Sequence, residues 1–472
     1  MNKLTIIVTY YNAEEYITGC LESIKQQRTQ DFNLIIVNDG STDQSKKLMD
    51  EAIKDYDKNI RFIDLDENSG HAHARNIALE EVETPYFMFL DADDELASYA
   101  ITFYLEKFNN TDGLIAPIHS FTTQRPQFVD LDRVRVEYFN AKENINSFLR
   151  KQSACNIIFR TAIVRAHHIR FNENLNTYVD WSFVLEYMKY VNKFVRIFNF
   201  PFYFRGEVYD PFETLTLSEQ NFDILFKDYV NSFYDAIKRA TNPKVREFIV
   251  TKMGNKIANE FEPTRYDINE RYQTHKDTLV ELSKFLHVHL VKNQKLINKI
   301  ETILLMNNET DKAFKVNQFR KTLRHVKNIV LRRKNKERSL YDLTDKEDNV
   351  KPKTIVFESF GGKNYSDSPK YIYEYMQKYY PNYRYIWSFK NPDKNVVPGS
   401  AEKVKRNSAE YYQAYSEASH WVSNARTPLY LNKKENQTYI QTWHGTPLKR
   451  LANDMKVVRM PGTTTPKYKR NF

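Results

Sequence analysis

The chain has 472 residues, with 70 Lys or Arg against 60 Asp or Glu, so its net charge is +10. At roughly 150 residues per domain, we expect two to four domains. Hydrophobic residues make up 41% and aromatic residues 14%, which excludes an intrinsically disordered chain. Two cysteines, Cys20 and Cys155, are too few for a disulfide framework, and we expect both to be buried thiols in a reducing compartment.

Short apolar strands alternate with helical stretches in the first part of the chain. The expected strands are KLTIIVT, FNLIIVN, IRFIDL and YFMFL, and the expected helices between them cover residues 13–27, 44–54 and 72–81. This alternation predicts a parallel sheet with helices on both faces. Ligands of such sheets bind where the strands end.

Polar residues cluster at these predicted strand ends. The motifs, in chain order, are NDGSTD at 38–43, ENSGHAHARN at 67–76 and DADDE at 91–95. Two carboxylates separated by one residue, Asp91 and Asp93, can hold a divalent cation that neutralises a pyrophosphate. Asp39 could accept hydrogen bonds from a base or a ribose. Any one motif could simply cap the following helix, but the ordered set favours a nucleotide site.

The segments TIIVTYYNAEEYITGCLESIKQQ, IIVNDGSTDQS, NSGHAHARN and FLDADDEL resemble the nucleotide-binding half of the family 2 glycosyltransferases, which have the GT-A fold. The resemblance covers about residues 1–210. It implies that Asp39 contacts the nucleotide base and that Asp91 and Asp93 bind Mn²⁺ or Mg²⁺. It also implies that Asp180, in YVDWSFVLEYM, is the catalytic base.

Two positions depart from the pattern of this family. Val179 stands where a Glu is expected, and Ala78 stands where a glycine usually follows the Arg-Asn pair. Both departures concern the acceptor side of the site. The domain is therefore either an active sugar transferase or a fold retained for binding.

Residues 211–338 are predicted to be helical, and the net charge is concentrated in their last part. Residues 312–338 hold eleven Lys or Arg and the single acid Glu337, a surplus equal to the +10 of the whole chain. An apolar stripe at spacings of three and four runs through the same segment: Val316, Phe319, Leu323, Val326 and Val330. A basic amphipathic helix of this kind either lies on an anionic membrane or packs its stripe on a neighbouring domain. Nucleic-acid binding is not expected, because no aromatic-rich sheet motif accompanies the charge.

A second alternating unit is predicted at 354–472, after a charged linker at 339–353. Its expected strands are TIVFESF, YRYIWSF, HWVSNA and YIQTW, with helices at 370–379 and 409–416. Gly361 and Gly362 follow the first strand and precede a helix. Such a turn can bind phosphate through backbone N–H groups, although it is also an ordinary connection.

The segments FESFGGKNYSDSPKYIYEYM, YRYIWSF, SHWVSNARTPLYL and YIQTWHGTPLKRLANDM resemble the CDP-glycerol glycerophosphotransferases. This family builds poly(glycerol phosphate) wall teichoic acid in Gram-positive bacteria. Its fold is GT-B, in which two Rossmann-like halves face each other across a cleft. Residues 354–472 resemble the first half, so we expect the chain to be truncated, with the second half absent.

The same resemblance assigns roles around the WHGT motif. By spacing alone, His444 would be a structural histidine at a strand end, but the motif implies that it is catalytic. It would take the proton of the acceptor hydroxyl as this attacks the β-phosphate of CDP-glycerol and CMP leaves. The implied substrate-binding residues are Trp443, Gly445, Thr446, Lys449, Gly361, Gly362 and Asp367. Without the second half, we expect His444 to be idle in this chain.

These expectations combine into one leading hypothesis and two alternatives. The leading one is a peripheral enzyme at the cytoplasmic face of the membrane that polymerises glycerol phosphate from CDP-glycerol onto a lipid-linked acceptor, with no cofactor required. The first alternative is a metal-dependent family 2 glycosyltransferase that uses a nucleotide sugar to modify a cell-wall polymer, through Asp91, Asp93 and Asp180. The second is a non-catalytic scaffold that binds membrane and polymer.

Overall fold

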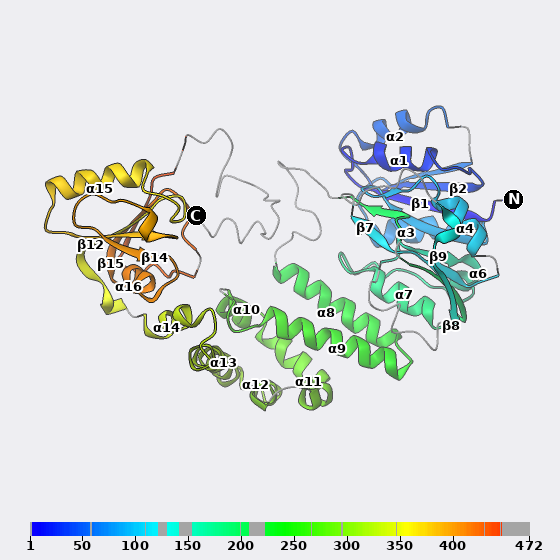
Figure 1. Cartoon of the computed structure of the whole chain (residues 1–472). Coiled ribbons are helices and arrows are strands. Elements are labelled where there is room, and N and C mark those ends of the chain that lie inside the picture. Colours follow the sequence, from blue (N-terminus) through cyan, green and yellow to red (C-terminus); the bar gives the residue numbers. More distant parts are fainter. Residues whose placement is uncertain are drawn as a thin grey trace. The chain divides into compact units, whose positions relative to one another are not determined.

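The chain folds into two compact units (Figure 1). The computed structural model describes residues 2–56, 59–108, 110–120, 130–140, 153–198, 200–206, 222–265, 267–293, 296–345, 347–428, 430–443 and 445. The first unit contains the described residues up to Ala258, and the second begins at Asn259.

The first unit is built on an eight-stranded sheet with the order β3-β2-β1-β4-β9-β6-β10-β8. The first four strands along the chain are parallel: β1 (Leu4–Tyr10), β2 (Phe32–Asn38), β3 (Ile60–Asp64) and β4 (Tyr86–Asp91). The other four are β6 (Gly113–Ile115), β8 (Val136–Asn140), β9 (Ile157–Arg160) and β10 (Lys193–Ile197). All seven residues of β1 are buried, as expected of a central strand covered on both faces.

The helices between the parallel strands fall where the sequence predicts them. They are α1 (Ile17–Lys25), α2 (Ser45–Ile53) and α3 (His71–Glu80), and α3 packs on β1 and β2. The sequence pattern did not predict β9, which runs antiparallel between β4 and β6. A small second sheet is formed by β5 (Glu95–Leu96), β11 (Tyr203–Arg205) and β7 (Ile118–Ser120). The remaining helices of this part are α4 (Ala100–Lys107), α6 (Thr161–Ala166) and α7 (Asp180–Met188).

The first unit extends beyond the expected domain end at residue 210, because α8 (Phe222–Arg239) and α9 (Pro243–Glu260) pack on it. Buried Asp228 of α8 accepts hydrogen bonds from the backbone N–H and the hydroxyl of Thr177, at 3.2 and 3.0 Å. The ammonium group of Lys252 lies 4.7 Å from the centre of the Trp181 ring, a cation–π contact. These contacts join the start of the helical region to the GT-A-like domain.

The second unit combines helices with a fully parallel five-stranded sheet. The helices are α10 (Ile268–Thr274), α11 (Lys276–Asn293), α12 (Leu296–Met306), α13 (Thr310–Val330) and α14 (Lys336–Thr344). The sheet has the order β14 (Glu402–Lys405), β13 (Arg384–Phe389), β12 (Lys351–Glu358), β15 (Ala418–Ser423) and β16 (Thr438–Gln441). Both α15 (Asp367–Tyr379) and α16 (Ala409–Glu417) pack on β12. Of the helices in the described part of the chain, none is both long and apolar enough to cross a membrane.

Residues 339–353, expected to be a linker, include the end of α14 and the start of β12. Tyr341 is 4% exposed and stacks on Tyr412 with 5.3 Å between ring centres. The high charge of this segment suggested an exposed connection, but one of its acids is buried in an ion pair. The segment is therefore part of the folded second unit.

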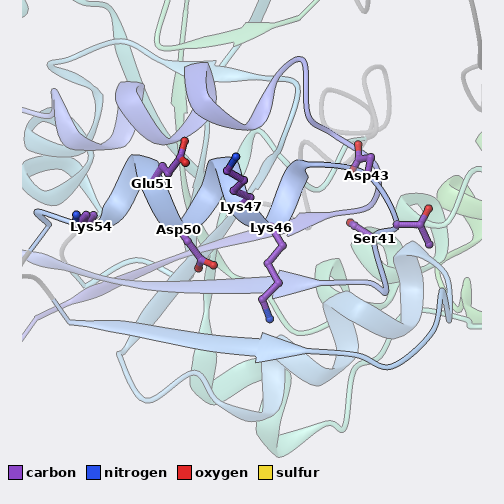
Figure 2. Close-up of a pocket in the computed structure, with 8 residues that line it drawn as sticks. Ser41, Asp43, Lys46, Lys47, Asp50, Glu51 and Lys54 are labelled. Atoms are coloured by element: carbon purple, nitrogen blue, oxygen red, sulfur yellow. The ribbon is translucent and has the colours of Figure 1, made fainter.

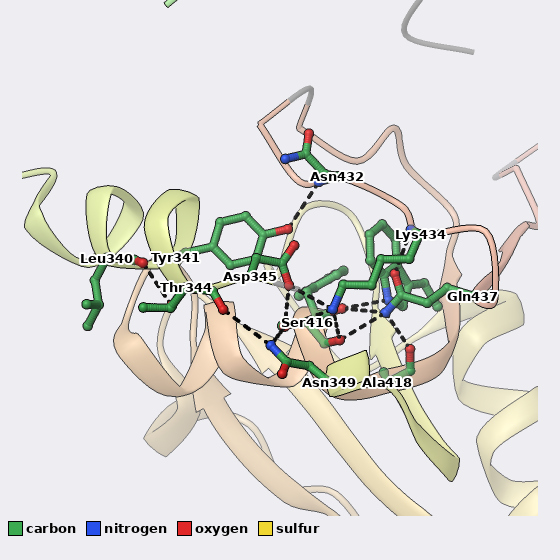
Figure 3. Close-up of polar contacts among 12 residues, drawn as sticks. Leu340, Tyr341, Thr344, Asp345, Asn349, Ser416, Ala418, Asn432, Lys434 and Gln437 are labelled. Carbon is green, nitrogen blue, oxygen red and sulfur yellow. Dashed lines mark hydrogen bonds and ion pairs between the residues drawn. The ribbon is translucent and has the colours of Figure 1, made fainter. Parts of the chain in front are cut away.

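That ion pair joins Asp345 to Lys434, which are 9% and 3% exposed at the side chain (Figure 3). The Lys434 Nζ lies 2.8 Å from Asp345 Oδ1 and donates to the Ser416 carbonyl at 2.9 Å. The Ser416 hydroxyl donates to the same carboxylate, and Gln437 donates to the Ala418 carbonyl at 2.7 Å. Each buried charge therefore has its partner within the network, as burial requires.

Replacing Lys434 with Met keeps the apolar stem but leaves the Asp345 carboxylate buried without its cation. We expect the free energy of unfolding of the second unit to fall by about 3–5 kcal/mol. Hydrogen exchange at the β15 amides, followed as a function of urea concentration, measures the free energy of unfolding of the second unit alone. The control is Lys378→Ala on the exposed side of α15, expected to change stability by less than about 0.5 kcal/mol. Equal losses in the two variants would contradict this role of Lys434.

Candidate functional site

The first unit places Asp39 directly after β2, where the sequence predicts a nucleotide contact. Asp39 is 3% exposed, and its carboxylate accepts hydrogen bonds from the backbone N–H groups of Ser69 at 2.8 Å and Gly70 at 3.0 Å. These bonds hold the loop that leads into α3. A side chain at neighbouring Gly40 would come within 2.3 Å of the Glu67 backbone, so this approach requires glycine. The role of Asp39 in nucleotide binding stays a prediction.

Arg75, on the buried side of α3, joins the two carboxylates that the sequence assigns to chemistry. Its guanidinium donates to Asp180 Oδ1 at 2.6 Å and to Asp91 Oδ1 at 2.8 Å. The Cys155 thiol donates to Asp91 Oδ2 at 3.1 Å, and the Ala154 N–H donates to Asp180 Oδ2 at 2.9 Å. The expected metal ligand Asp91 and the expected base Asp180 are thus held together at the end of β4 and the start of α7.

Arg75 itself is only 1% exposed. Its guanidinium carbon lies 4.8 Å from the centre of the Phe89 ring and 5.3 Å from that of Phe171. Burying a guanidinium this deeply is favourable only with paired carboxylates and good packing. No role for Arg75 is predicted from the sequence, although its place on the alanine-rich buried face of α3 indicates a charge with a partner.

Asp91, Asp93 and Asp94 form a carboxylate cluster in which one oxygen from each lies within 4.8 Å of the others. Burial raises the pKa of Asp91, but Arg75 and then His71 more than offset this and bring it to about 2. Burial and the charge of Asp91 raise the pKa of Asp93 to about 6 and that of Asp94 to about 8. A divalent cation would relieve this repulsion, and carboxylate oxygens are the ligands that Mg²⁺ and Mn²⁺ prefer.

Within the cluster, Asp94 is already engaged. Its carboxylate accepts hydrogen bonds from the Tyr203 hydroxyl and from the Gly206 N–H at 2.8 Å. Both carboxylate oxygens of Asp91 also accept hydrogen bonds, from Arg75 and from Cys155, so cation binding by Asp91 and Asp93 stays a prediction. His71 begins α3 beside this cluster, and burial together with Arg75 lowers its pKa to about 4, which makes it neutral at physiological pH.

A surface cavity on α2 and the loop before it has none of these groups in its lining. It has a volume of about 680 Å³ and is lined by Ser41, Thr42, Asp43, Lys46, Lys47, Asp50, Glu51 and Lys54 (Figure 2). Lys46 is paired with Asp64 rather than free to bind a ligand. The mixture of acids and lysines that lines this cavity is typical of a solvated helix face, so we do not assign a catalytic or binding role to the cavity.

The second unit brings the predicted glycine turn to the carboxyl end of its parallel sheet. Phe360, Gly361 and Gly362 follow β12 with φ values of +48°, +62° and +77°. The Asn424 side chain, fully buried after β15, accepts from the Phe360 N–H at 2.7 Å and donates to Asp367 Oδ2 at 2.5 Å. Asn424 therefore fixes the turn against the start of α15, a role that the sequence analysis missed.

Two of the residues assigned around the WHGT motif follow β16 at the same edge. β16 ends at Gln441, shortly before Trp443 and Gly445, and the Thr442 N–H between them and the strand donates to the Ser423 carbonyl at 2.9 Å. Because β16 lies parallel to β15, and β15 to β12, the ends of these strands share one side of the sheet. His444, Thr446 and Lys449 lie outside the described residues.

Two family models match separate parts of the chain. Residues 5–168 match glycosyl transferase family 2, and residues 340–472 match CDP-glycerol:poly(glycerophosphate) glycerophosphotransferase. The chain is also 49% identical over 128 residues to the teichoic acid poly(glycerol phosphate) polymerase of Bacillus subtilis (strain 168). That match covers 26% of this chain and 17% of the relative.

Two solved structures are similar to different parts of the chain. One, described as the wall teichoic acid polymerase TagF with an H444N substitution and a CDPG soak, is 99% identical over 33% of this chain and 38% of that one, with a TM-score of 0.32. The other is residues 1–349 of S. aureus TarS in complex with UDP, 18% identical over 67% of this chain and 90% of that one, with a TM-score of 0.51. At this identity the TarS match shows the fold alone. The chain thus spans well under half of the teichoic acid polymerases that it matches. Residues 5–168 are similar to glycosyl transferase family 2, and residues 340–472 are similar to the CDP-glycerol:poly(glycerophosphate) glycerophosphotransferases.

Proposed function

We propose that the full-length protein transfers glycerol phosphate units from CDP-glycerol to a lipid-linked poly(glycerol phosphate) acceptor and releases CMP. The observation that supports this most is the common edge of β12, β15 and β16. It gathers the Gly361–Gly362 turn, Asn424 and the start of the WHGT motif on one side of a parallel sheet. Edges of this type bind phosphorylated ligands.

The proposed reaction needs a base at this edge. The acceptor hydroxyl forms a new bond to the β-phosphorus of CDP-glycerol as the bond to the CMP oxygen breaks, and the hydroxyl proton passes to His444. A neutral imidazole near pH 7 suits this step. We assign substrate contacts to Trp443, Gly445, Thr446 and Lys449 on one side and to Gly361, Gly362 and Asp367 on the other. In this proposal the chain supplies one half of a GT-B site.

We further propose that α13 holds the protein on the anionic cytoplasmic face of the membrane. The apolar stripe expected in this helix is exposed: the exposed fractions are 55% for Phe319, 43% for Leu323 and 71% for Val330. The helix instead buries its opposite face, with Ala313, Asn317, His325 and Asn328. An exposed apolar stripe flanked by Lys and Arg suits insertion into the surface of anionic lipid.

The carboxylate cluster of the first unit supports a second function, transfer of a sugar from a nucleotide sugar to a cell-wall polymer. A cation held by Asp91 and Asp93 would neutralise the diphosphate of the leaving nucleotide. Asp180 would take a proton from the acceptor. Arg75 holds the carboxylate of Asp180 at the site through a hydrogen bond. The close approach of three carboxylates is the observation that favours this function.

Changing His444 to Ala in the full-length protein should lower glycerol phosphate transfer by about 10²- to 10⁴-fold, because the base is lost. Incorporation of radiolabelled glycerol from CDP-glycerol into a lipid-linked primer measures the rate. His420→Gln, a histidine in the middle of β15, is the matched control and should keep wild-type activity. Transfer near the wild-type rate in His444→Ala would rule out this role of the histidine.

The membrane proposal predicts that the double variant Phe319→Ser/Leu323→Ser binds anionic vesicles at least about tenfold more weakly, since each apolar side chain contributes about 1.5–3 kcal/mol when buried. Flotation with phosphatidylglycerol vesicles measures binding, and phosphatidylcholine vesicles test the need for charge. The control is Ile224→Ser in α8, also an exposed apolar residue, at 49%. Unchanged flotation of the double variant would show that the stripe serves packing on another part of the protein.

The second function predicts that Asp91→Asn abolishes turnover of the nucleotide sugar and that a chelator does the same to the wild type. The expected loss is large because the cation carries most of the charge stabilisation of the leaving diphosphate. Product release from a panel of nucleotide sugars, with added Mn²⁺ or Mg²⁺, gives the rate. Asp50→Asn, an exposed acid of α2, should leave the rate unchanged. Turnover that survives both the chelator and Asp91→Asn argues against a metal-dependent transferase.

A further inference from the structure

A buried carboxylate and a partly exposed guanidinium form an ion pair beside the glycine turn of the second unit. Glu358, the last residue of β12, is 1% exposed and accepts a hydrogen bond from the Ser388 hydroxyl at 2.7 Å. Arg406, which directly follows β14, has its Nε 3.5 Å from Glu358 Oε2. The Arg406 N–H donates to the Phe389 carbonyl at 2.7 Å, so its backbone is fixed to the end of β13.

The other end of this guanidinium faces the turn. A Cβ built on Gly361 would lie 3.5 Å from Arg406 Nη1, so the missing side chain leaves the guanidinium next to the backbone of the turn. The Arg406 side chain is 20% exposed, which allows a ligand to reach it. A guanidinium has five N–H donors, and the contact with Glu358 orients the group through its Nε side.

The charges around the turn favour an anion. Lys363 directly follows Gly362 and is exposed, as is Lys390, whose N–H donates to the Gly362 carbonyl at 2.6 Å. Of the acids near the turn, Glu358 is paired with Arg406, and Asp367 keeps its charge and accepts a hydrogen bond from the Asn424 amide. Arg406, Lys363 and Lys390 thus bring three cationic residues next to a turn with two glycines in the left-handed region, and such turns can bind phosphate through their backbone N–H groups.

We propose that Arg406 and the Gly361–Gly362 turn form a phosphate-binding subsite, with Glu358 as the residue that positions Arg406. This proposal rests on the proposed glycerophosphotransferase function for the identity of the ligand. Two substrates of that reaction carry the required phosphate: the phosphodiester of the acceptor chain and the diphosphate of CDP-glycerol. Arg matches a phosphate with two parallel hydrogen bonds, which Lys cannot do.

Binding to the 472-residue chain tests the subsite without any need for turnover. The probes are a short synthetic glycerol phosphate oligomer, CDP-glycerol and inorganic phosphate, each measured by calorimetry, with neutral polyglycerol as the uncharged comparison. We expect Arg406→Ala to weaken binding of at least one of the first two probes by about ten- to a hundredfold, the effect of one charge-assisted hydrogen-bonded contact. The probe affected identifies the source of the phosphate. Arg406→Lys should fall between wild type and Arg406→Ala.

The matched control is Lys403→Ala, which removes an exposed cation of the same strand whose Nζ donates to the Pro392 and Asn395 carbonyls. It should bind every probe as the wild type does. Unchanged affinity of Arg406→Ala for both substrates would overturn the subsite. So would equal losses in Arg406→Ala and Lys403→Ala, since these would reflect net charge alone.

Arg406→Ala also leaves Glu358 buried without its cation, so the chain could lose stability. The double variant Glu358→Gln/Arg406→Met removes both charges and should recover the thermal stability while still binding weakly. Recovery of binding together with stability would overturn the proposal. Glu358→Gln alone should bind with an intermediate loss, because Arg406 remains but is less firmly oriented. If the oligomer binds through Arg406 but the full-length protein transfers no glycerol phosphate, the proposed function fails and the subsite stands.

Discussion

The parallel register of β12, β15 and β16 is the constraint on which the proposed site depends. Ile355 pairs with His420, and His420 with Thr438, so the three strands end together. Buried Phe357 and Trp387 pack on the α15 side of the sheet, and Trp421 with Tyr415 on the α16 side. A shift of one residue would turn these side chains to the wrong face, so the two cores fix the register. The register in turn brings the glycine turn, Asn424 and Trp443 to one edge.

In each unit, a buried ion pair joins segments that are distant in the sequence. In the first, Arg75 connects α3, β4 and α7 through Asp91 and Asp180. In the second, Lys434 ties the strand-connecting segment before β16 to Asp345 ahead of β12. Such pairs add little net stability compared with apolar packing, but breaking one is costly. They therefore specify which segments meet, and in the first unit the segments that meet carry the candidate chemistry.

The sequence predicted the local elements well and the long-range ones poorly. The parallel strands, their helices and the polar strand ends follow from periodicity, which each segment carries in itself. The antiparallel strand β9 and the role of Arg75 depend on partners far along the chain, since Asp180 is 105 residues from Arg75. The stripe of α13 was recognised, yet periodicity cannot tell that this helix buries His325 and Asn328 instead. For the same reason, the charged residues 339–353 suggested a linker, because the partner of Asp345 is distant Lys434.

The proposed functions place two different transfer reactions in the two units, so the product distinguishes them. We propose that polymer synthesis takes place at the edge of the sheet in the second unit, with glycerol phosphate as the transferred group. Mass spectrometry of a lipid-linked primer after incubation of the full-length protein with CDP-glycerol tests this most directly. We predict a ladder in which each step adds one glycerol phosphate and releases one CMP. A primer that stays unextended with CDP-glycerol, but gains single sugars when a nucleotide sugar is supplied, would contradict the proposed glycerol phosphate transfer.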